Sequence, residues 1–556
     1  MKESDPVDPS FRQSAWAKLT QLDSPEVLIL GGGVNGIGLL RDLSLNGVSA
    51  VLLETGDFAA GASSASSRMA HGGLRYLEGR EFKLVAESAR ERNMLLHDAA
   101  HLVKPLETVV PVKAWIRGLP QTILRFVGLS HKAAPFSVAA LKCGLIVYER
   151  FGAIRRALPR HRVLINRGLF PAGLPADTRA VVSYYDGQIT GPERLLFEML
   201  DDAAARPGIA ALNHIGWTVD DTGLFQVTDA ALGHTHALRP RIIVNATGAA
   251  IDRVNATLGL ETRFVRGVKG AHLALSHPQL FARMNGRAFY FDDGRGRMVI
   301  CLPVGEIILV GTTEVEVHDP ADHSVAETEI SYLLTALNSL FGDIHIDRSH
   351  IAAVTSGIRP LQASDGNATQ AARDHALRRN DRGGIPVLSL VGGKWTTFRA
   401  FAEQTADAIL AHLGKARSQS TAGRAYPGAN PPEAAVLARD AGLSVERAAV
   451  LIGRYGALGA VIGAYCGAYR GANADAPLQH APDYSVREIA WLVDQRMAST
   501  LEDLVLRRMG VVMTGRLTRA ALQEIAAIMA QTLGRGPDWI ATHVDSCAAD
   551  PRILWE

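Results

Sequence analysis

The first strong hydrophobic pattern in the chain is a short apolar run, a glycine turn and then a helical repeat of apolar positions. Residues 27–30 (VLIL) predict a strand, residues 37–45 (IGLLRDLSL) predict a helix, and residues 48–54 (VSAVLLE) predict a second strand. Strand, helix and strand within about 30 residues have the size of a βαβ unit. The N-terminal part of the chain is therefore expected to form a parallel α/β sheet.

Further along the chain, apolar and polar residues alternate in short stretches, which is typical of strands. These stretches are FQVTD, RIIVN, HLAL, MVICL and EIILVGTT within residues 215–345, and PVLSLV at 386–391. A helical pattern follows the last of them. Residues 414–432 are small, polar and rich in proline and glycine, and they predict a linker. Three segments beyond it have helical periodicity: AAVLARDAG, SVREIAWLVDQRM and RAALQEIAAIMAQTL.

Two other segments differ from these in composition. Residues 1–25 are a polar extension, in which FRQSAWAKLTQL predicts a short surface helix. Residues 113–167 are both apolar and strongly basic, and glycines and prolines interrupt them. This basic segment predicts either a solvated face or a surface that contacts an anionic membrane, where each Lys or Arg contributes about 1 kcal/mol.

Length and charge narrow the class of protein. A chain of 556 residues predicts two to four domains, and 58 Lys and Arg against 56 Asp and Glu give no reason to expect a nucleic-acid partner. No secretory signal is apparent at the N-terminus, and no run reaches the roughly 18 apolar residues that cross a bilayer. The cysteines have no metal-binding or paired spacing, so we expect no metal site and a reducing, cytoplasmic location; they are Cys143, Cys301, Cys466 and Cys547.

The glycine turn of the βαβ unit has the GxGxxG spacing of a dinucleotide-binding loop. Gly31, Gly33 and Gly36 give a tight turn, a close approach to a pyrophosphate and tight helix–strand contact. The helix N-terminus then presents free amides to phosphate oxygens. Glu54 ends the second strand, where a carboxylate accepts hydrogen bonds from ribose hydroxyls. The spacing predicts a bound dinucleotide but does not separate NAD from FAD.

The segment after Glu54 resembles the flavin loop of the FAD-dependent glycerol-3-phosphate dehydrogenases, which are quinone-linked. It reads SSASSRMAHGGLRYLE at 63–78. Further motifs of this family follow in order from Glu26 to about residue 535: VNATG, RGVKGAH, VGTTE, SGIRPL, ARDH, GGKWTTFR and YSVREIAWLVDQRMASTLEDLVLRR.

The resemblance implies an α/β fold in three parts. A Rossmann-like FAD-binding domain of the D-amino-acid-oxidase type is joined to a mixed-sheet substrate domain and a C-terminal all-α domain. We expect the FAD-binding domain at 26–112, 180–254 and 346–413, the substrate domain at 113–179 and 255–345, and the helical domain at 433–556.

The resemblance also implies an activity. Non-covalent FAD would oxidise sn-glycerol 3-phosphate to dihydroxyacetone phosphate and pass electrons to a quinone, with the protein peripheral on the inner face of the cell membrane. A homodimer is left open. An NAD-dependent dehydrogenase is disfavoured, because no second nucleotide fingerprint is present and the serine loop would have no role.

The predicted FAD contacts combine the glycine turn, the serine loop and two later glycine turns. They are Gly31, Gly33, Gly36, Glu54, Ser63, Ser64, Ser67, His71, Gly72, Gly73, Ala246, Gly248, Gly392, Gly393, Thr396 and Thr397.

A phosphorylated substrate needs cations, and arginine offers a planar fork for phosphate oxygens. We expect Arg359 and Arg75 to bind the substrate, and Lys394 to contact phosphate or stabilise negative charge on the reduced flavin. Tyr76, Thr312 and Thr313 are expected to add hydroxyl contacts. For the proton acceptor we expect His272 first and His71 second, because the pKa of histidine lies near 6.5.

The chain departs from the family pattern near the expected substrate. Glu314 replaces the aspartate of GTTD, Ala249 and Ala250 replace Pro-Trp after VNATG, and Val304 replaces a tryptophan after Pro303. The segment 190–193 (TGPE) also differs from the family's DDARL pattern. Smaller side chains enlarge a pocket, so a longer polyol phosphate such as erythritol 4-phosphate is a second candidate substrate. Two further hypotheses are an oxygen-using glycerophosphate oxidase and a non-catalytic flavin-binding sensor.

Overall fold

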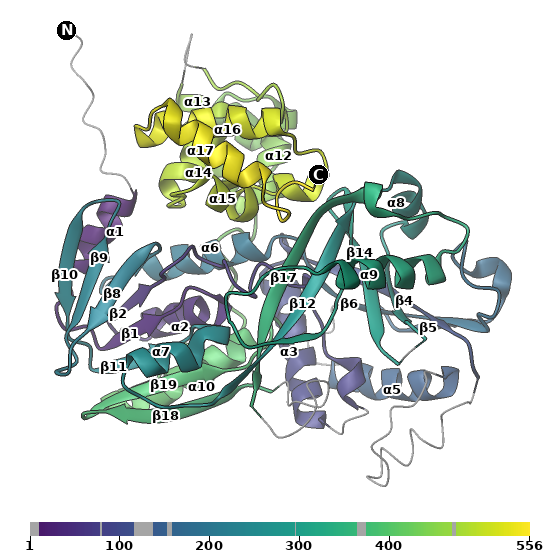
Figure 1. The fold of residues 1–556 in the computed structure, drawn as a ribbon, viewed down its shortest axis with the longest axis horizontal. Helices are drawn as coiled ribbons and strands as arrows, with labels where there is room; N and C mark the ends of the chain where they lie inside the picture. Colours follow the sequence, from purple (N-terminus) through teal and green to yellow (C-terminus); the bar gives the residue numbers. More distant parts are fainter. Residues whose placement is uncertain are drawn as a thin grey trace.

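The computed structural model describes residues 11–77, 81–115, 137–152, 158–294, 296–363, 374–469 and 474–555. Two β-sheet bodies lie side by side, and a cluster of helices formed by the C-terminal part of the chain lies above them (Figure 1). This arrangement confirms the predicted fold class, with a Rossmann-like sheet, a mixed sheet and an all-α C-terminal domain.

The first sheet has six strands in the order β18-β19-β11-β1-β2-β7. Its five consecutive strands from β19 to β7 are parallel, and β18 is an antiparallel edge. Short apolar strands buried on both faces are typical of parallel sheets. The strands are β1 (Val27–Leu30), β2 (Ala50–Leu53), β7 (Ile209–Leu212), β11 (Ile242–Asn245), β18 (Ala376–Arg382) and β19 (Ile385–Val391).

Helices and a small antiparallel sheet cover the first sheet and share its hydrophobic core. Helix α2 packs between α6 and α10, and α1 packs on β7. The small sheet contributes apolar residues such as Phe225 and Val227 to the same core. These elements are α1 (Phe11–Leu19), α2 (Val34–Leu45), α6 (Pro192–Ala204), α7 (Ile251–Thr257), α10 (Phe398–Leu413), β8 (Ile215–Val219), β9 (Phe225–Asp229) and β10 (His234–Leu238).

The second sheet is larger and mixed, with the order β16-β12-β15-β14-β13-β4-β6-β3; β17 also pairs with β12, and β5 with β6. Its strands are β3 (Met69–Ala70), β4 (Val103–Val112), β5 (Arg162–Leu164), β6 (Ala180–Ile189), β12 (Val265–Leu275), β13 (Ala288–Asp292), β14 (Met298–Val304), β15 (Ile307–Gly311), β16 (Val315–Val317) and β17 (Ile351–Gln362). The helices of this body are η1 (Leu74–Leu77), α3 (Phe82–Asp98), α5 (Val138–Phe151), α8 (Pro278–Met284) and α9 (Glu327–Leu340).

The C-terminal domain packs on one face of the second sheet. Successive side chains of a strand point to opposite faces. Accordingly, Ile308 and Val310 of β15 join the core with α8 and α9, whereas Ile307 and Leu309 join the core of the C-terminal helices. These helices are α11 (Ala434–Ala441), α12 (Val445–Tyr455), α13 (Gly459–Ala468), α14 (Val486–Gln495), α15 (Leu501–Asp503), η8 (Leu504–Arg508), α16 (Arg519–Leu533) and α17 (Pro537–Ala548).

Three of the predicted domain boundaries need correction. Strands β4 and β6 pair with each other along their whole length in the second sheet, and β17 pairs with β12 there. The segments 103–112, 180–189 and 351–362 therefore belong with the substrate sheet and not, as the sequence predicts, with the FAD-binding domain. Alternating hydrophobicity identifies a strand but does not say which sheet it joins.

Two further expectations change in detail. The N-terminal helix α1 is not a simple surface helix, because Ala15, Trp16 and Leu19 are buried in the first core. The stretch Val445–Ala468 is long and apolar enough to cross a membrane by length and composition. It is broken at Gly456, whose φ is +60°, into the packed helices α12 and α13. We therefore describe it as part of the helical domain.

Candidate active site

The glycine turn after β1 leaves space that any side chain would fill. Gly31 has φ +111°, and a Cβ there would lie 2.7 Å from the carbonyl oxygen of Ala246. A Cβ on Gly36 would lie 2.1 Å from the carbonyl oxygen of Gly31. Only glycine is compatible with both positions. The turn of Ala246 to Gly248 thus packs directly on the dinucleotide loop, as the two motifs predict.

Two buried polar atoms at this cradle lack a partner among the described residues. They are Asn35 Oδ1, at the N-terminus of α2, and Thr397 Oγ1, at the N-terminus of α10. Buried polar atoms are nearly always hydrogen-bonded, so both positions fit a ligand that supplies the missing partners. Asn35 Nδ2 also donates to the carbonyl of Gly392 at 3.2 Å, which ties the two glycine turns together.

Glu54 lies at the end of β2, next to the glycine turn. Its carboxylate accepts hydrogen bonds from the amides of Gly32 and Gly56, each at 2.7 Å. Burial raises the pKa of Glu54, and the two amide hydrogen bonds oppose that rise. The amides fix the carboxylate at the strand end where a ribose is expected.

The serine loop runs from the glycine turn to the second sheet. Ser63 Oγ accepts a hydrogen bond from the amide of Val34 at 3.0 Å, and Ser67 Oγ lies 2.9 Å from His272 Nε2. Gly357 of β17 allows close approach, because a Cβ there would lie 2.9 Å from Ala65 Cβ. Ser64 hydrogen-bonds within the loop, to Gly61 O at 3.4 Å. The loop therefore connects the nucleotide cradle to the substrate sheet.

The His71-Gly72-Gly73 turn is fixed through its backbone. The Thr396 hydroxyl accepts from the His71 amide at 3.0 Å and donates to the His71 carbonyl at 3.1 Å. The amide of Gly72 donates to the hydroxyl of Tyr148 at 2.7 Å, and Gly73 has φ +76°. This places the predicted flavin loop against the second predicted flavin turn.

The second turn, GGKWTT, follows β19 and precedes α10. Gly392 and Gly393 have φ values of +77° and +100°, and a Cβ on Gly392 would lie 2.7 Å from the Asp374 carbonyl. Lys394 Nζ donates to Ser88 Oγ of α3 at 3.2 Å. Trp395 Nε1 donates to the carbonyl of Ser63 at 2.8 Å, so this turn also holds the serine loop.

Arg359 lies on β17, opposite Val268 of β12, and reaches the end of β15. Its guanidinium donates to Thr312 Oγ1, and Nη1 lies 3.6 Å from Glu314 Oε1. Gly270 leaves the necessary room, because a Cβ there would lie 2.7 Å from Arg359 Nη2. The side chain of Arg359 is about one third exposed (29%). Its guanidinium is therefore held in place by protein contacts and is still accessible to a ligand.

Thr313 differs from Thr312, and the expectation that it contacts substrate is not supported by its geometry. Its hydroxyl is buried, accepts from the Ala271 amide at 2.9 Å and donates to Glu329 Oε1 at 2.6 Å. Glu329 in turn lies 3.4 Å from the buried ammonium of Lys269. Thr313 therefore anchors the turn that presents Thr312.

His272 lies on β12 and is buried, with a relative exposure of 2%. Burial, followed by the charges of Arg359 and Arg68, lowers its pKa to about 3. The imidazole is therefore neutral at physiological pH. A neutral ring with such a low pKa accepts a proton readily only when an anion lies beside it, which is the condition that a bound phosphorylated substrate would create.

The low pKa of His272 predicts a pH dependence of stability. An unfolded histidine titrates near pH 6.5, so protons favour the unfolded chain between pH 6.5 and about pH 3. The contribution of the neutral His272 to the free energy of unfolding is fully present above pH 6.5, and about 2 kcal/mol of it is lost at pH 5. His272→Gln should therefore show a smaller fall in Tm from pH 8 to pH 5 than the unaltered protein. Equal falls in the two proteins would contradict the buried, neutral state.

The structure brings several of the predicted substrate and flavin residues together in two groups. Arg359, Thr312, His272 and Ser67 form one group, and Lys394 belongs to a second group with Thr396 and the His71 turn, as described above. The side chains of Arg75 and Tyr76 lie outside the part of the chain that the structure describes. The two groups are close in sequence, because Ser67 of the first group is only four positions before His71 of the second.

Sequence reasoning missed three residues of this site. Asn35 lies inside the GxGxxG spacing, Trp395 inside GGKWTT, and Arg68 directly after the serine loop. Arg68 is buried and pairs with Glu193 at 3.1 Å. All three lie within or beside the motifs, and this was the only sequence signal that could have identified them. A motif does not show which of its unspecified positions make contacts and which serve only as spacers.

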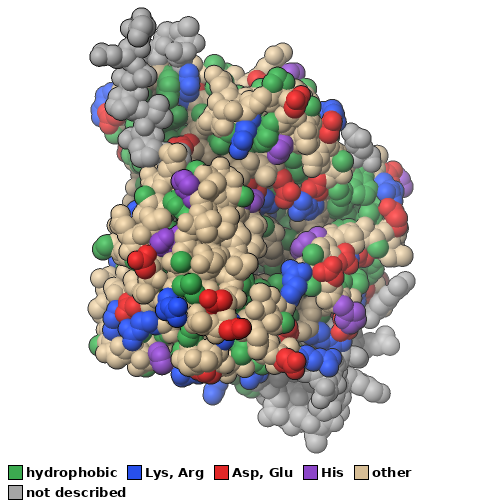
Figure 2. Space-filling view, turned by 60° about the vertical axis from the view of Figure 1, so that its left-hand side comes forward, with side chains coloured by type: hydrophobic (Ala, Val, Ile, Leu, Met, Phe, Trp, Pro, Cys, Tyr) green, Lys and Arg blue, Asp and Glu red, His purple; other side chains and the backbone are tan. Residues whose placement is uncertain are grey.

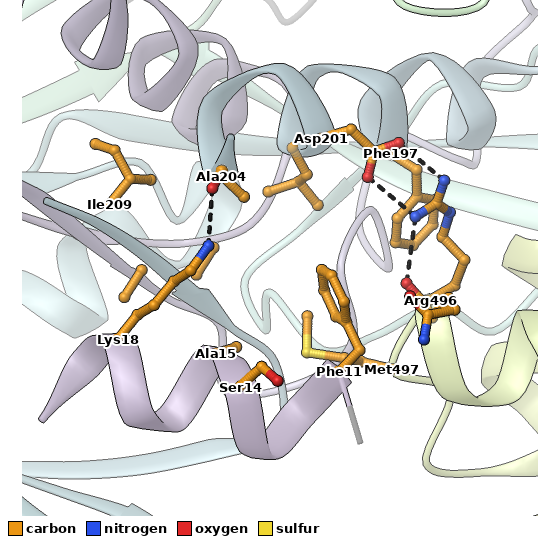
Figure 3. A pocket seen from close by; sticks show the side chains of 14 residues that line it. Phe11, Ser14, Ala15, Lys18, Phe197, Asp201, Ala204, Ile209, Arg496 and Met497 are labelled. Atoms are coloured by element: carbon orange, nitrogen blue, oxygen red, sulfur yellow. Dashed lines mark hydrogen bonds and ion pairs between the residues drawn. The ribbon is translucent and has the colours of Figure 1, made fainter. Parts of the chain in front are cut away.

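A separate pocket lies away from this site, between α1, α6 and the residues that follow α14. Phe11, Ala15, Phe197 and Met497 contribute to its lining, and Arg496 pairs with Asp201 at its edge (Figure 3). It contains none of the predicted site residues.

Comparison with known proteins agrees with this geometry. Residues 26–408 match the family model described as FAD dependent oxidoreductase, and residues 419–539 match the C-terminal domain of alpha-glycerophosphate oxidase. The chain is 31% identical to a glycerol-3-phosphate dehydrogenase of Synechocystis over 520 residues, covering 88% of this chain and 89% of that protein. It is also 31% identical to a D-erythritol 1-phosphate dehydrogenase of Brucella abortus over 402 residues, covering 69% of this chain and 74% of that protein.

Among solved structures, the glycerol-3-phosphate dehydrogenase from Bacillus halodurans complexed with FAD has the same fold. Its TM-score is 0.74 at 20% sequence identity, and the match covers 98% of both chains. Since the cradle fits a dinucleotide and the family model spans more than half of the chain, FAD is the cofactor of this protein. The chain therefore belongs to the family of FAD-dependent glycerol-3-phosphate dehydrogenases.

Proposed function

We propose that this protein oxidises sn-glycerol 3-phosphate to dihydroxyacetone phosphate and passes the electrons to a quinone. One observation carries the proposal: the Arg359 fork, the Thr312 hydroxyl and the neutral His272 converge beside the serine loop that leads from the FAD cradle. Such a site suits an alcohol that carries a phosphate, because the oriented cation can bind the phosphate and the neutral base can accept the proton of the hydroxyl.

The reaction removes a hydride from the carbon and a proton from the hydroxyl of the substrate. Bound FAD supplies the hydride acceptor. Arg359 holds an oxygen anion of the substrate, and Thr312 and Glu314 limit the directions that its guanidinium can take. The neutral imidazole of His272 would accept the hydroxyl proton, and Ser67 Oγ, 2.9 Å from its Nε2, lies where it can relay that proton. Lys394 adds positive charge at the second turn.

Anaerobic addition of sn-glycerol 3-phosphate to the FAD-loaded protein tests the proposal. We expect the visible absorbance of the oxidised flavin to bleach, with dihydroxyacetone phosphate formed in equal amount. A protein that binds FAD but is not bleached by any polyol phosphate would instead be the non-catalytic sensor.

A four-carbon polyol phosphate is the second candidate substrate. Two observations favour it: the similarity to the Brucella abortus D-erythritol 1-phosphate dehydrogenase, and the small residues Ala249 and Ala250 next to the dinucleotide loop. Values of kcat/KM for erythritol phosphates and sn-glycerol 3-phosphate decide between them. A tenfold preference for the four-carbon compound would overturn our first choice.

The electron acceptor has its own test. The C-terminal match to a domain of alpha-glycerophosphate oxidase keeps molecular oxygen as a candidate. Stoichiometric hydrogen peroxide in air would identify an oxidase. Turnover with a soluble quinone analogue, without peroxide, would support the dehydrogenase.

Quinone reduction requires access to a membrane, and we propose that the basic segment provides it from the cytoplasmic side. Large exposed apolar side chains of this segment are Trp115, Ile146, Val147 and Ile165, and Leu169 follows two residues beyond it. Basic residues accompany them, and in the described part of the segment Lys113, Lys142, Arg150, Arg160, Arg162 and Arg167 are all exposed. Helix α5 lies on the side that faces away from the C-terminal helices (Figure 1).

The face shown in Figure 2 has a mixed charge. On this face, Lys and Arg are interspersed with Asp and Glu. Such mixed charge gives no extended field of one sign for a polyanion. Exposed apolar side chains combined with cations, as in the basic segment, are the features of an interfacial membrane contact.

Replacing Ile146 and Ile165 by glutamate should weaken binding to anionic vesicles at least tenfold at low salt, because it removes exposed apolar area that the membrane would cover and adds negative charge. Co-sedimentation with phosphatidylglycerol-containing vesicles measures this. Val461→Glu is the matched control, since Val461 is equally exposed (55%, against 53% for Ile146) but lies in α13. Equal binding by both variants, or no binding by the unaltered protein, would refute the membrane contact.

A further inference from the structure

The C-terminal domain places two adjacent, buried arginines against the nucleotide end of the FAD domain. Arg507 and Arg508 form the end of η8 and are 4% and 2% exposed. Both donate hydrogen bonds to the carboxylate of Asp57, and Arg508 Nη2 lies 2.7 Å from Asp57 Oδ1. Asp57 is itself buried and lies three residues after Glu54. The contact therefore joins the C-terminal domain to the loop that bears the predicted ribose ligand.

A second path leads from the same domain to the same loop. Asp503 Oδ2 lies 2.8 Å from His214 Nε2, and the His214 amide donates to the Gly56 carbonyl at 2.7 Å. Asp503 also accepts from Arg507 at 2.9 Å, and Asn213 donates to Asp57 at 2.7 Å. All charged partners at this junction are thus paired across the two domains or within them.

These contacts reach the carboxylate of Glu54 by one further step. The Gly56 amide donates to Glu54 Oε1, so Gly56, together with the Gly32 amide on Oε2, fixes the position of that carboxylate. The negative charge of Asp57 is also close enough to disfavour an ionised Glu54. Two guanidinium groups on Asp57 offset that charge and tie this residue to the C-terminal domain.

Asp57, His214 and Asp503 also offer three ligand atoms within 4.8 Å of one another. The guanidinium groups of Arg507 and Arg508 already occupy the carboxylate oxygens from the protein side. The cations of this cluster are therefore those of the protein itself, and the cluster is an interdomain ion-pair network.

We propose that Arg507 and Arg508 are positioning residues for FAD: by clamping Asp57 they hold Glu54 in place for the ribose, so FAD affinity depends on docking of the C-terminal domain. The inference rests on the cofactor and not on the proposed substrate or acceptor. It gives the helical domain a role at the nucleotide site.

FAD titration of the full-length apoprotein tests the proposal. Arg508→Met should raise the Kd for FAD at least tenfold, while kcat at saturating FAD stays within about twofold of the unaltered protein. Arg508→Lys keeps the charge but not the two-point contact with Asp57, and it should raise the Kd about threefold. Either variant that binds FAD as tightly as the unaltered protein overturns the proposal, and the lysine variant decides the matter if the methionine variant does not fold.

Arg496→Met is the matched control. Arg496 pairs with Asp201 at 2.8 Å across the same two domains (Figure 3). Among the described contacts, its side chain has no hydrogen bond to loop 54–57. Its loss should change the Kd for FAD less than threefold. An equal loss of affinity in Arg496→Met and Arg508→Met would show that general loosening of the domain, and not the clamp on Asp57, is responsible.

A double-mutant cycle with Glu54→Gln tests whether the arginines act through Glu54. A purely structural role of Arg508 would give the same change in the Kd for FAD with either residue at position 54. If the arginines act through Glu54, Arg508→Met should change the Kd less than threefold when Glu54 is already glutamine. An undiminished tenfold effect in that background would refute the route through Glu54.

Discussion

Arg359→Met should lower kcat/KM for sn-glycerol 3-phosphate by about 10³-fold while FAD stays bound. The reason is geometric and electrostatic: a partly exposed guanidinium, fixed by Thr312 and Glu314, loses its charge-assisted hydrogen bonds to the substrate. Steady-state kinetics and the flavin spectrum measure the two properties separately. Arg359→Lys retains the charge without the fork, so we expect it to recover about tenfold of the loss.

The control for Arg359 is an arginine in an ordinary ion pair. Arg283 pairs with Asp343 at 2.6 Å, and Asp343 is half exposed. Such pairs contribute about 0–1 kcal/mol to stability, so Arg283→Met should leave kcat/KM within twofold of the unaltered protein. If Arg359→Met retained more than a tenth of the original kcat/KM, the substrate would have to be held elsewhere, and the site built around β12, β15 and β17 would be wrong.

Gly36→Ala should prevent stable binding of FAD and raise its Kd at least 100-fold. A Cβ at this position would lie 2.1 Å from the Gly31 carbonyl, a backbone atom that cannot move without opening the turn that holds the pyrophosphate. The purified protein should be colourless, and added FAD should not restore its visible spectrum.

Gly453→Ala in α12 is the matched glycine replacement, because beyond the neighbouring backbone of its own helix no described heavy atom lies within 4 Å of its Cβ position. That variant should remain yellow and equally stable or slightly more stable, since alanine favours a helix. A yellow Gly36→Ala protein with an unchanged Kd would show that the cradle is not where the cofactor binds.

The sequence allowed much of the nucleotide half to be predicted, because local patterns determine it. The apolar run at 27–30, the glycine spacing and the acid at Glu54 are close in sequence, and they became β1, the α2 turn and the end of β2. The helical periodicity of the C-terminal segments likewise became α11, α14 and α16.

The substrate half was harder, because its geometry depends on which strands pair and in what register. The pairing of Arg359 with Val268 brings the guanidinium to Thr312, and no periodicity contains that information. The same limit explains why the sequence alone places β4, β6 and β17 with the wrong sheet. Burial of His272 and its low pKa also follow from packing rather than from the RGVKGAH motif.

The order of strands in the first sheet has a consequence for biosynthesis. The ribosome delivers β1, β2, β7 and β11 long before β19, yet β19 pairs with β11, and the turn after it closes the cradle through Gly392 and Asn35. During synthesis one edge of β11 must therefore wait for its neighbour. The cradle is therefore complete only when β19 and the Gly392 turn have left the ribosome, although the glycine turn at its other end is among the first parts of the chain to be made.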